Sequence, residues 1–262
     1  MNIPEDIEKV FARLDDLRKR SQKGELGISD FLSPRELHYA EAYLKRAGDS
    51  FVSFGGYGGA ERKRIYVLPD YMEGILDADE FENYGHHCEV AAVNVCSAGY
   101  RRLSHRDYLG AILGLGIERS VVGDILVYGE NGENAVVFCN DTMVEFFTRE
   151  LTKVASEKVR CEAVELSAVE VPERKTAQVN DTVASPRLDC IVGALCSLSR
   201  EKARSAVVSG LVEVDFEAEE RPDRTVCAPC SVSVRGYGRY RVISVEDKTK
   251  KGRYRLVAEK FL

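Results

Sequence analysis

Residues 185–214 read SPRLDCIVGALCSLSREKARSAVVSGLVEV, and no other stretch says more about the fold of this chain. Apolar residues recur there at i, i+3, i+4 and i+7, which predicts the buried face of a helix: Leu188, Ile191, Val192 and Leu195. After a break, Ser199 is a good N-cap for a second helix, and Gly210 is a typical C-terminal stop. Residues 211–216 then alternate between apolar and polar, as an antiparallel strand does. The stretch therefore predicts two short helices followed by a strand.

The second predicted helix carries an unusual charge pattern. A helix N-terminus bears partial positive charge and favours acidic residues, but here Arg200 and Lys202 occupy the first turn with only Glu201 to offset them. Arg204 lies one turn beyond Arg200 on the same face. Free backbone N–H groups and convergent cations together bind phosphate well. The plainer interpretation is that these cations are ordinary solvated surface charge.

A second basic run follows a predicted strand at 231–235. Residues 235–241 read RGYGRYR. The glycines allow a close backbone approach, while the arginines and tyrosines offer phosphate contacts and stacking faces. Arg235, Arg239 and Arg241 are therefore candidate RNA contacts, although the run could also be a charged hairpin edge that prevents aggregation.

The N-terminal part of the chain predicts helices. Residues 2–23 carry apolar side chains at helical spacing. A second helix is predicted at 34–46, because Ser33 and Glu36 have the spacing of a capping box around a proline at the first helical position. The glycine-rich segment 55–59 lacks the Gly-Lys-Ser/Thr ending of a phosphate-binding loop, so no nucleotide site is expected there.

The middle of the chain, residues 86–167, changes to a mixed pattern. β-Branched runs predict strands at 89–96, 124–128, 135–139 and 159–166, and helical spacing predicts helices at 105–115 and from 141 to about 154. The order strand, helix, strand, strand, helix, strand is the split βαβ arrangement of ferredoxin-like and RRM-like domains. Residues 168–183 are polar without a sustained period and predict a connection, whose end at 176–183 could enter a strand.

Composition favours a globular protein in a reducing compartment. With 262 residues, 44% of them hydrophobic and 31% charged, the chain is long enough for two or three domains with proper cores. No run approaches the roughly 18 apolar residues that span a bilayer. The acidic N-terminus does not resemble a secretory signal, and the eight cysteines are scattered through mostly apolar runs. We therefore expect a cytoplasmic protein with no membrane partner.

The charge is distributed unevenly along the chain. Residues 180–262 hold 15 Lys+Arg against 12 Asp+Glu, a net charge of +3, whereas residues 1–179 hold 22 against 31, a net charge of −9. The overall charge of −6 argues against nucleic acid as a partner of the whole surface. The asymmetry is nevertheless typical of a basic contact module attached to an acidic body.

The motifs resemble those of a known family. Arg187-Leu188-Asp189, Ser199-Arg200-x-x-Ala203 and Gly210-Leu211-Val212-x-Val214 form the pattern of the S4 RNA-binding domain. The ending at 233–240 is similar to the S4 domains of bacterial YlmH-type proteins. Segments 55–64 and 105–117 also resemble that family, so the likeness extends over nearly the whole chain.

The resemblance to YlmH-type proteins implies a non-catalytic RNA binder without a cofactor. Such a protein binds the large ribosomal subunit through structured ribosomal RNA, with transfer RNA as another possible contact, and serves the rescue of stalled ribosomes. The S4 fold implies that a helix pair faces the RNA. The expected contacts are Arg187, Ser199, Arg200, Lys202, Arg204, Arg235, Arg239 and Arg241, with secondary contacts at Arg62, Arg64 and Arg106.

Other classes of function stay open. His105-Arg106-Asp107 is one residue short of the His-Arg-Leu-Asp signature of pseudouridine synthases, in which the S4 domain usually precedes the catalytic one. The middle domain could dock a protein instead of RNA, because its strands offer only Tyr128 and Phe138 as stacking aromatics. The pair Cys227 and Cys230 has no second ligand pair, and we expect no metal site.

We therefore predict an α+β monomer of three parts. An N-terminal helical subdomain spans 1–75, an RRM-like domain spans 76–168, and a linker at 169–182 leads to an S4 domain at 183–262. No catalytic residue is assigned.

Overall fold

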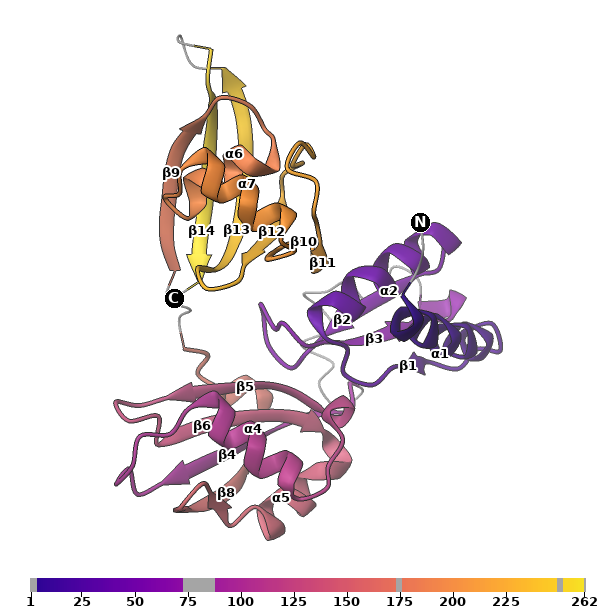
Figure 1. Ribbon diagram of the computed structural model, residues 1–262. Helices are drawn as coiled ribbons and strands as arrows, with labels where there is room; N and C mark the ends of the chain where they lie inside the picture. Colours follow the sequence, from indigo (N-terminus) through magenta and orange to yellow (C-terminus); the bar gives the residue numbers. More distant parts are fainter. Residues whose placement is uncertain (1–3, 73–87, 173–175, 249–251, 262) are drawn as a thin grey trace. The chain divides into compact units, whose positions relative to one another are not determined.

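The computed structural model describes residues 4–72, 88–172, 176–248 and 252–261. The chain divides into two compact units, 1–172 and 173–262 (Figure 1). Each unit has hydrophobic core residues of its own. The division at 172 differs from the predicted start of the last domain at 183. The predicted boundary at 76 lies outside the described residues. No helix in the described part of the chain has the length and apolar character needed to cross a bilayer.

The N-terminal part of the first unit packs two helices on a small sheet. Helix α1 spans Glu5–Ser21 and helix α2 spans Pro34–Ala47. Strands β1 (Gly27–Ile28), β2 (Phe51–Phe54) and β3 (Arg64–Val67) form an antiparallel sheet in the order β1-β3-β2. The sheet corrects the expectation of a purely helical segment. Its strands have only two to four residues, too few to show a clear period in the sequence.

The predicted capping box of α2 is present. The Ser33 hydroxyl accepts a hydrogen bond from the Glu36 backbone N–H at 3.3 Å, and the Glu36 carboxylate accepts one from the Ser33 N–H at 2.7 Å. Two otherwise unpaired backbone donors are thereby satisfied, which fixes where the helix begins.

A five-stranded antiparallel sheet forms the rest of the first unit. Its order is β5 (Val122–Tyr128), β6 (Asn134–Asn140), β4 (Val90–Ser97), β8 (Glu157–Val164) and β7 (Lys153–Val154). Helices α4 (His105–Gly114) and α5 (Val144–Glu150) pack on one face, where Val93, Val95, Ile112 and Phe147 are buried together. Short 3-10 turns lie at 70–72, 119–121, 141–143 and 166–168. Helix α5 ends before Val154, which belongs to β7 instead of the predicted longer helix.

The N-terminal part packs on the opposite face of this sheet. Tyr57 packs on Phe138 with ring centroids 4.9 Å apart, and both belong to a core shared with Val90 and Ala92. Gly56 has φ +98°, and a Cβ atom there would lie 2.4 Å from the Phe138 ring. The glycine-rich segment thus serves close packing against the sheet.

The second unit is a six-stranded antiparallel sheet with two helices on one face (Figure 1). Its order is β11 (Glu217–Ala218), β10 (Val212–Val214), β12 (Cys230–Val234), β13 (Gly238–Lys248), β14 (Tyr254–Phe261) and β9 (Thr176–Val183). Helices α6 (Leu188–Leu195) and α7 (Arg200–Val208) cover the inner face. Strand β9 takes up the second half of the predicted linker, where the sequence had allowed a strand at 176–183. Its mostly polar side chains gave no apolar period, yet all eight of its residues pair with β14.

Candidate RNA-binding surface

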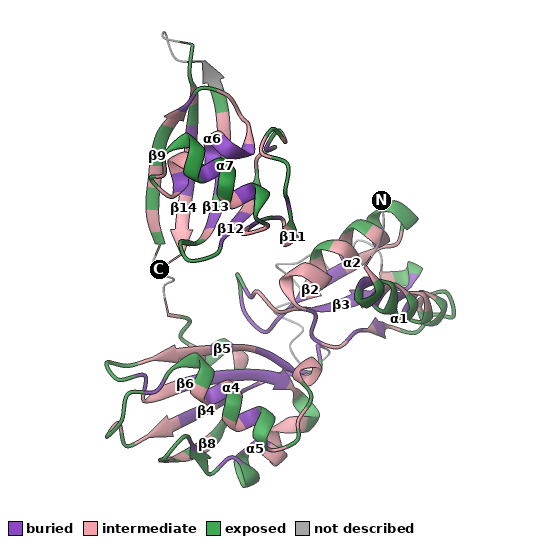
Figure 2. Ribbon diagram, in the orientation of Figure 1, coloured by how far each residue is buried: buried purple, intermediate pink, exposed green. Residues whose placement is uncertain are grey.

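Helices α6 and α7 cross closely because small residues meet between them. Ala203 of α7 is fully buried, and a Cβ atom on Gly193 of α6 would lie 3.7 Å from the Ala203 Cβ and 3.3 Å from the Leu198 carbonyl oxygen. The apolar residues predicted for α6 are all buried against the sheet. This packing holds the N-terminus of α7 at the surface (Figure 2).

The N-terminus of α7 displays cations. The Ser199 hydroxyl caps the helix by accepting a hydrogen bond from the Lys202 N–H at 3.4 Å. Arg200, Lys202 and Arg204 are all exposed. Arg200 and Arg204 lie one turn apart on the same face, whereas Lys202 is about 200° around the helix from Arg200. The helix therefore brings Arg200 and Arg204 together and places Lys202 on its other flank.

Arg187 is held by a buried carboxylate. The Asp189 side chain is 1% exposed and accepts two hydrogen bonds from the Arg187 guanidinium, each of 3.0 Å. Arg200 Nε lies 3.9 Å from the same carboxylate. Burial, the largest single influence, raises the pKa of Asp189, but the hydrogen bonds and charge of Arg187 together with the hydrogen bonds from Cys190 bring the pKa below its usual value. The prediction of three free guanidinium groups is therefore corrected. The Arg187 guanidinium is occupied by its two hydrogen bonds to Asp189, whereas 75% of the Arg200 side chain is exposed.

A groove beside the start of α7 adds a cation that sequence reasoning missed. Arg253 and Arg200 both line it, together with Asp181, Asp189 and Leu198. The Arg253 guanidinium donates to the Thr182 hydroxyl at 2.9 Å and to the Thr182 carbonyl. Arg253 precedes β14 and was invisible to the sequence patterns because the pairing of β14 with β9 brings it to the groove.

The loop at 219–226 contributes two more arginines next to α6. Glu219 is nearly buried and accepts hydrogen bonds from Arg221 at 3.1 Å and from Arg224 at 2.7 Å. These hydrogen bonds, with that from Arg221 the largest influence, lower the pKa of Glu219 to about 2. The Leu188 N–H donates to the Arg224 carbonyl at 2.8 Å, so the loop is fastened to the start of α6. Both arginines therefore support the helix pair.

The second predicted basic set lies on the other side of the sheet. Arg239 and Arg241 alternate with Tyr240 and Val242, which are buried under the helices. Their side chains consequently project from the outer face, where Arg239 lies over the Phe261 ring at 4.6 Å. Arg235 is exposed in the turn between β12 and β13. The structure does not bring Arg239 and Arg241 together with the cations of α7.

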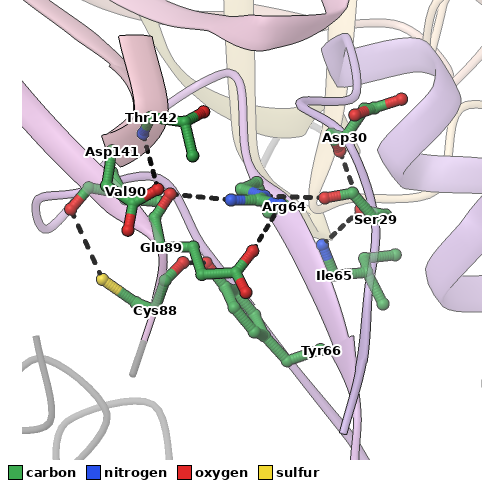
Figure 3. A network of polar contacts seen from close by, with 10 residues as sticks. All are labelled: Ser29, Asp30, Arg64, Ile65, Tyr66, Cys88, Glu89, Val90, Asp141 and Thr142. Atoms are coloured by element: carbon green, nitrogen blue, oxygen red, sulfur yellow. Dashed lines mark hydrogen bonds and ion pairs between the residues drawn. The ribbon is translucent and has the colours of Figure 1, made fainter. Parts of the chain in front are cut away.

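Two of the expected secondary contacts are internal. Arg64 is 5% exposed and donates to the Ser29 and Glu89 carbonyls, each at 2.7 Å, and to the Glu89 carboxylate at 3.3 Å. Figure 3 shows this guanidinium between the N-terminal part and the start of β4, with Tyr66 donating to the Cys88 carbonyl nearby. Arg64 therefore joins two layers of the unit, and the expectation of an RNA contact there is withdrawn.

Arg62 is also part of the framework. Its guanidinium donates to the backbone carbonyls of Val122, Phe31 and Arg119 at 2.8–3.1 Å. Burial lowers the pKa of Arg62, and burial beside Arg62 lowers the pKa of Arg119 to about 10. Arg62 is withdrawn as an RNA contact for the same reason as Arg64. Arg106 alone of the three is exposed.

The residues considered for catalysis or stacking have structural partners. Asp107 accepts hydrogen bonds from the Ser104 N–H at 2.8 Å and from the Ser104 hydroxyl at 2.6 Å, so Ser104 and Asp107 cap the start of α4. The Ser104 hydrogen bonds lower the pKa of Asp107. Phe138 is fully buried beneath Tyr57 and has no face for a base.

The paired cysteines of the second unit have different environments. Cys227 is exposed, whereas Cys230 is buried, and burial raises the pKa of its thiol to about 12. Among the residues that the structure describes, no cluster of three or more His, Cys, Asp or Glu side chains could hold a metal ion.

Comparisons with known proteins agree over most of the chain. Residues 5–72 match a family model described as "YlmH, N-terminal", and residues 86–168 match one described as "Putative RNA-binding domain in YlmH". The chain is 32% identical over 234 residues to "Ribosome-associated protein quality control protein P2" of Bacillus subtilis (strain 168), covering 89% of this chain and 86% of that protein. The solved structure of "Cell division protein ylmH from Streptococcus pneumoniae" matches 66% of this chain and 98% of its own, with a TM-score of 0.52 at 17% identity, and supports the fold alone.

Proposed function

Because the chain belongs to the YlmH family, we propose that it is a ribosome-associated RNA-binding protein that acts without catalysis in the quality control of stalled ribosomes. In this proposal the second unit is an S4-type module that binds structured ribosomal RNA of the large subunit, with transfer RNA as a further contact. The sheet at 88–164 is an RRM-like domain. The protein acts as a monomer in the cytoplasm.

The observation that carries the proposal is the exposed edge of α7. Arg200 and Arg204 lie one turn apart beside a Ser199-capped N-terminus, and Lys202 is exposed on the other side of the helix. Two guanidinium groups at this spacing can contact phosphates of one RNA backbone, while the free N–H groups of the first turn add further donors. Arg187, paired with Asp189, would position α6 and offer only its exposed edge to the RNA.

Charge reversal tests this assignment. Arg200→Glu/Arg204→Glu should abolish co-sedimentation with the large ribosomal subunit, because two phosphate contacts become repulsions. Lys9→Glu/Arg13→Glu is a matched control: both residues are exposed on α1 at the same spacing, and the change in charge is identical. Retained co-sedimentation of the α7 variant, with circular dichroism showing a folded protein, would contradict the proposal.

Salt dependence gives a second measure of the same contact. Each neutralised phosphate contributes roughly 0.7–0.9 to the slope of log K against log salt concentration. The variant Arg200→Gln/Arg204→Gln should therefore lower the magnitude of that slope by about 1 to 2. An unchanged slope would place the phosphate contacts elsewhere, and Arg241→Gln would then test the outer face of the sheet.

The proposal that the protein is not an enzyme has its own test. Asp107 is occupied in the α4 cap, which supports a structural role for the His105-Arg106-Asp107 segment. Incubation with ribosomal and transfer RNA, followed by mass spectrometry of nucleosides, should reveal no new pseudouridine. Pseudouridine that disappears with Asp107→Asn would overturn the non-catalytic assignment.

A further inference from the structure

The loop between β4 and α4, residues 98–104, displays a tyrosine to solvent. Tyr100 is 90% exposed, more than any other large hydrophobic side chain in the described part of the chain. The loop backbone is nevertheless anchored: the Gly99 N–H donates to the Ser97 hydroxyl at 3.3 Å, and the Leu103 N–H donates to the Asn131 carbonyl at 2.7 Å. Leu103 is buried. The Tyr100 ring is therefore held out from a fixed loop, where both of its faces are open.

Exposed arginines follow Tyr100 in the loop and on the first turn of α4. Arg101, Arg102 and Arg106 are all exposed, and Arg101 makes a hydrogen bond of 3.3 Å to the neutral Ser156 hydroxyl. Among the described residues, Arg102 and Arg106 have no hydrogen-bond or ion-pair partner through their side chains. An exposed tyrosine followed within a few residues by exposed arginines is a combination that suits single-stranded nucleic acid, since the ring can stack on a base while the cations contact phosphates.

The carboxylates nearest to the loop are occupied. Asp107 accepts two hydrogen bonds from Ser104 in the α4 cap. Glu133, whose Cβ would lie 3.3 Å from a Cβ on Gly99, accepts a hydrogen bond from the Asn131 N–H at 2.9 Å. Hydrogen bonds from backbone N–H groups lower the pKa of Glu133, so it is an anion near the loop. Both carboxylates are held by local backbone, and neither pairs with the three arginines in an ion pair.

The strand that leads into the loop borders an open pocket. Ala92 and Phe138 are buried in the core shared with the N-terminal part, whereas Asn94 of β4 and Tyr128 of β5 are only partly buried and line the pocket. With Val136, Val164 and residues 168–172 they line a pocket of about 430 Å³. The Tyr128 hydroxyl donates to the Asn94 side-chain oxygen at 3.0 Å. Valine walls and an amide edge suit a flat heteroaromatic ring with polar edges, such as a nucleobase.

We infer that the first unit holds a binding site for single-stranded RNA, with one base stacked on Tyr100 and a nearby base in the pocket of Asn94 and Tyr128. Arg102 and Arg106 contact the phosphates beside the stacked base. A duplex does not fit this site, because its bases already stack on each other. The inference rests on the proposed RNA-binding function and adds a site that is separate from α7.

The test uses the full chain carrying Arg200→Glu/Arg204→Glu, so that the proposed α7 contact is removed. A fluorescein-labelled uridine-rich oligoribonucleotide of about 10 nucleotides, a length that one such site covers, serves as the probe in anisotropy titrations. Tyr100→Ala should raise Kd about 10-fold or more, whereas Tyr100→Phe should stay near the parent, because stacking needs the ring and not the hydroxyl. Arg102→Glu and Asn94→Ala should also weaken binding.

Controls distinguish this site from non-specific RNA binding and from the RNA contact proposed for α7. Tyr71→Ala removes another largely exposed tyrosine, 65% exposed in the N-terminal part, and should leave Kd unchanged. Equal Kd values for the parent, Tyr100→Ala and Arg102→Glu would overturn the inference, as would equally tight binding of a perfect RNA duplex. Ribosome co-sedimentation reports on α7 independently: it can fail to respond to the α7 variant while the Tyr100 dependence holds, or the reverse.

Discussion

At the scale of single residues, buried carboxylates decide which arginines remain available. Asp189 holds Arg187 through two hydrogen bonds, and Glu219 holds Arg221 and Arg224. A buried carboxylate that loses its partners would be left with an uncompensated charge, so these pairs are part of the fold. The second unit therefore has arginines of two kinds: those that fasten loops to α6, and those such as Arg204 that reach solvent without a carboxylate partner among the described residues.

The Glu219 pairs predict acid sensitivity of the second unit. The pKa of Glu219 is lowered to about 2 in the folded protein, whereas an unfolded glutamate has a pKa of about 4.3. A lowered pKa stabilises the fold fully above the unfolded value, and this stabilisation is lost as pH falls from about 4.3 toward about 2. Urea denaturation across this range should show a smaller pH dependence of the unfolding free energy for Glu219→Gln. Identical pH dependence in both proteins would contradict the assignment.

The glycine-rich segment predicts a contrast between two neighbouring glycines. Gly56→Ala should lower the unfolding free energy by about 2 kcal/mol or more, because the new methyl group meets the Phe138 ring and the backbone has a positive φ. Gly59 also has a positive φ, but nothing lies within 4 Å of its added Cβ, so Gly59→Ala should cost about 1 kcal/mol. Chemical denaturation of both variants measures the difference. Equal losses would show that the close packing on Phe138 is not the reason for the glycine.

At the scale of elements, polar side chains decide how the layers of the first unit are joined. Strand β3 and the start of β4 belong to different sheets, and Arg64 bridges them through the carbonyls of Ser29 and Glu89 (Figure 3). The buried Tyr66 hydroxyl adds a hydrogen bond of 2.5 Å to the Cys88 carbonyl. Arg64 is thus a donor to the Ser29 carbonyl and a second donor to the Glu89 carbonyl, which also accepts from the Asp141 N–H at 3.2 Å, and these bonds join the N-terminal sheet to the larger one.

Arg64→Met tests this joint. The change removes the donor to the Ser29 carbonyl, one of two donors to the Glu89 carbonyl and the partner of the Glu89 carboxylate, so the first unit should lose about 3 kcal/mol of stability. RNA affinity of the folded protein should not change, because the guanidinium is internal. Arg13→Met, at an exposed position of α1, should alter neither quantity. A loss of RNA affinity at unchanged stability would restore Arg64 as a contact residue.

At the scale of the whole molecule, separate cores predict separable units. The buried residues of the second unit form one cluster that joins α6 and α7 to strands β9, β10, β12, β13 and β14. The first unit has three clusters of its own. No buried residue of the second unit's cluster belongs to a cluster of the first unit, which is the pattern of domains that fold independently.

Expression of residues 173–262 alone tests this division. The fragment should unfold cooperatively and should keep the α7-dependent binding of structured RNA, including its salt dependence. Residues 1–172 alone should keep the Tyr100-dependent binding of the single-stranded probe. A shorter fragment, residues 183–262, corresponds to the last domain as the sequence predicted it. This fragment should be unstable because it lacks almost all of β9 and exposes the edge of β14. Stable folding of the shorter fragment would contradict this role of β9.

The sequence by itself determined the helices and the capped edge that carries the RNA proposal. The boundaries of α2, α4, α6 and α7 were predicted closely, because caps and helical spacing involve residues within four positions of each other. The exposed set at Ser199, Arg200, Lys202 and Arg204 follows from the same local pattern. The spacing of the motifs also indicated the family, because their order along the chain can be recognised even where individual strands cannot.

Only the tertiary structure decided which side chains share a surface. Strand pairing joins residues far apart in the chain, so the sequence could suggest a strand at 176–183 but not its pairing with β14, and that pairing brings Arg253 to the groove. Alternation shows that Arg239 and Arg241 share a face, but not which face the helices cover. Burial of Arg64 likewise depends on the layer packed above it. The spacing of nearby residues determines where helices form. Which side chains are buried, and which face of a sheet the helices cover, depends on contacts that exist only once the whole unit has folded.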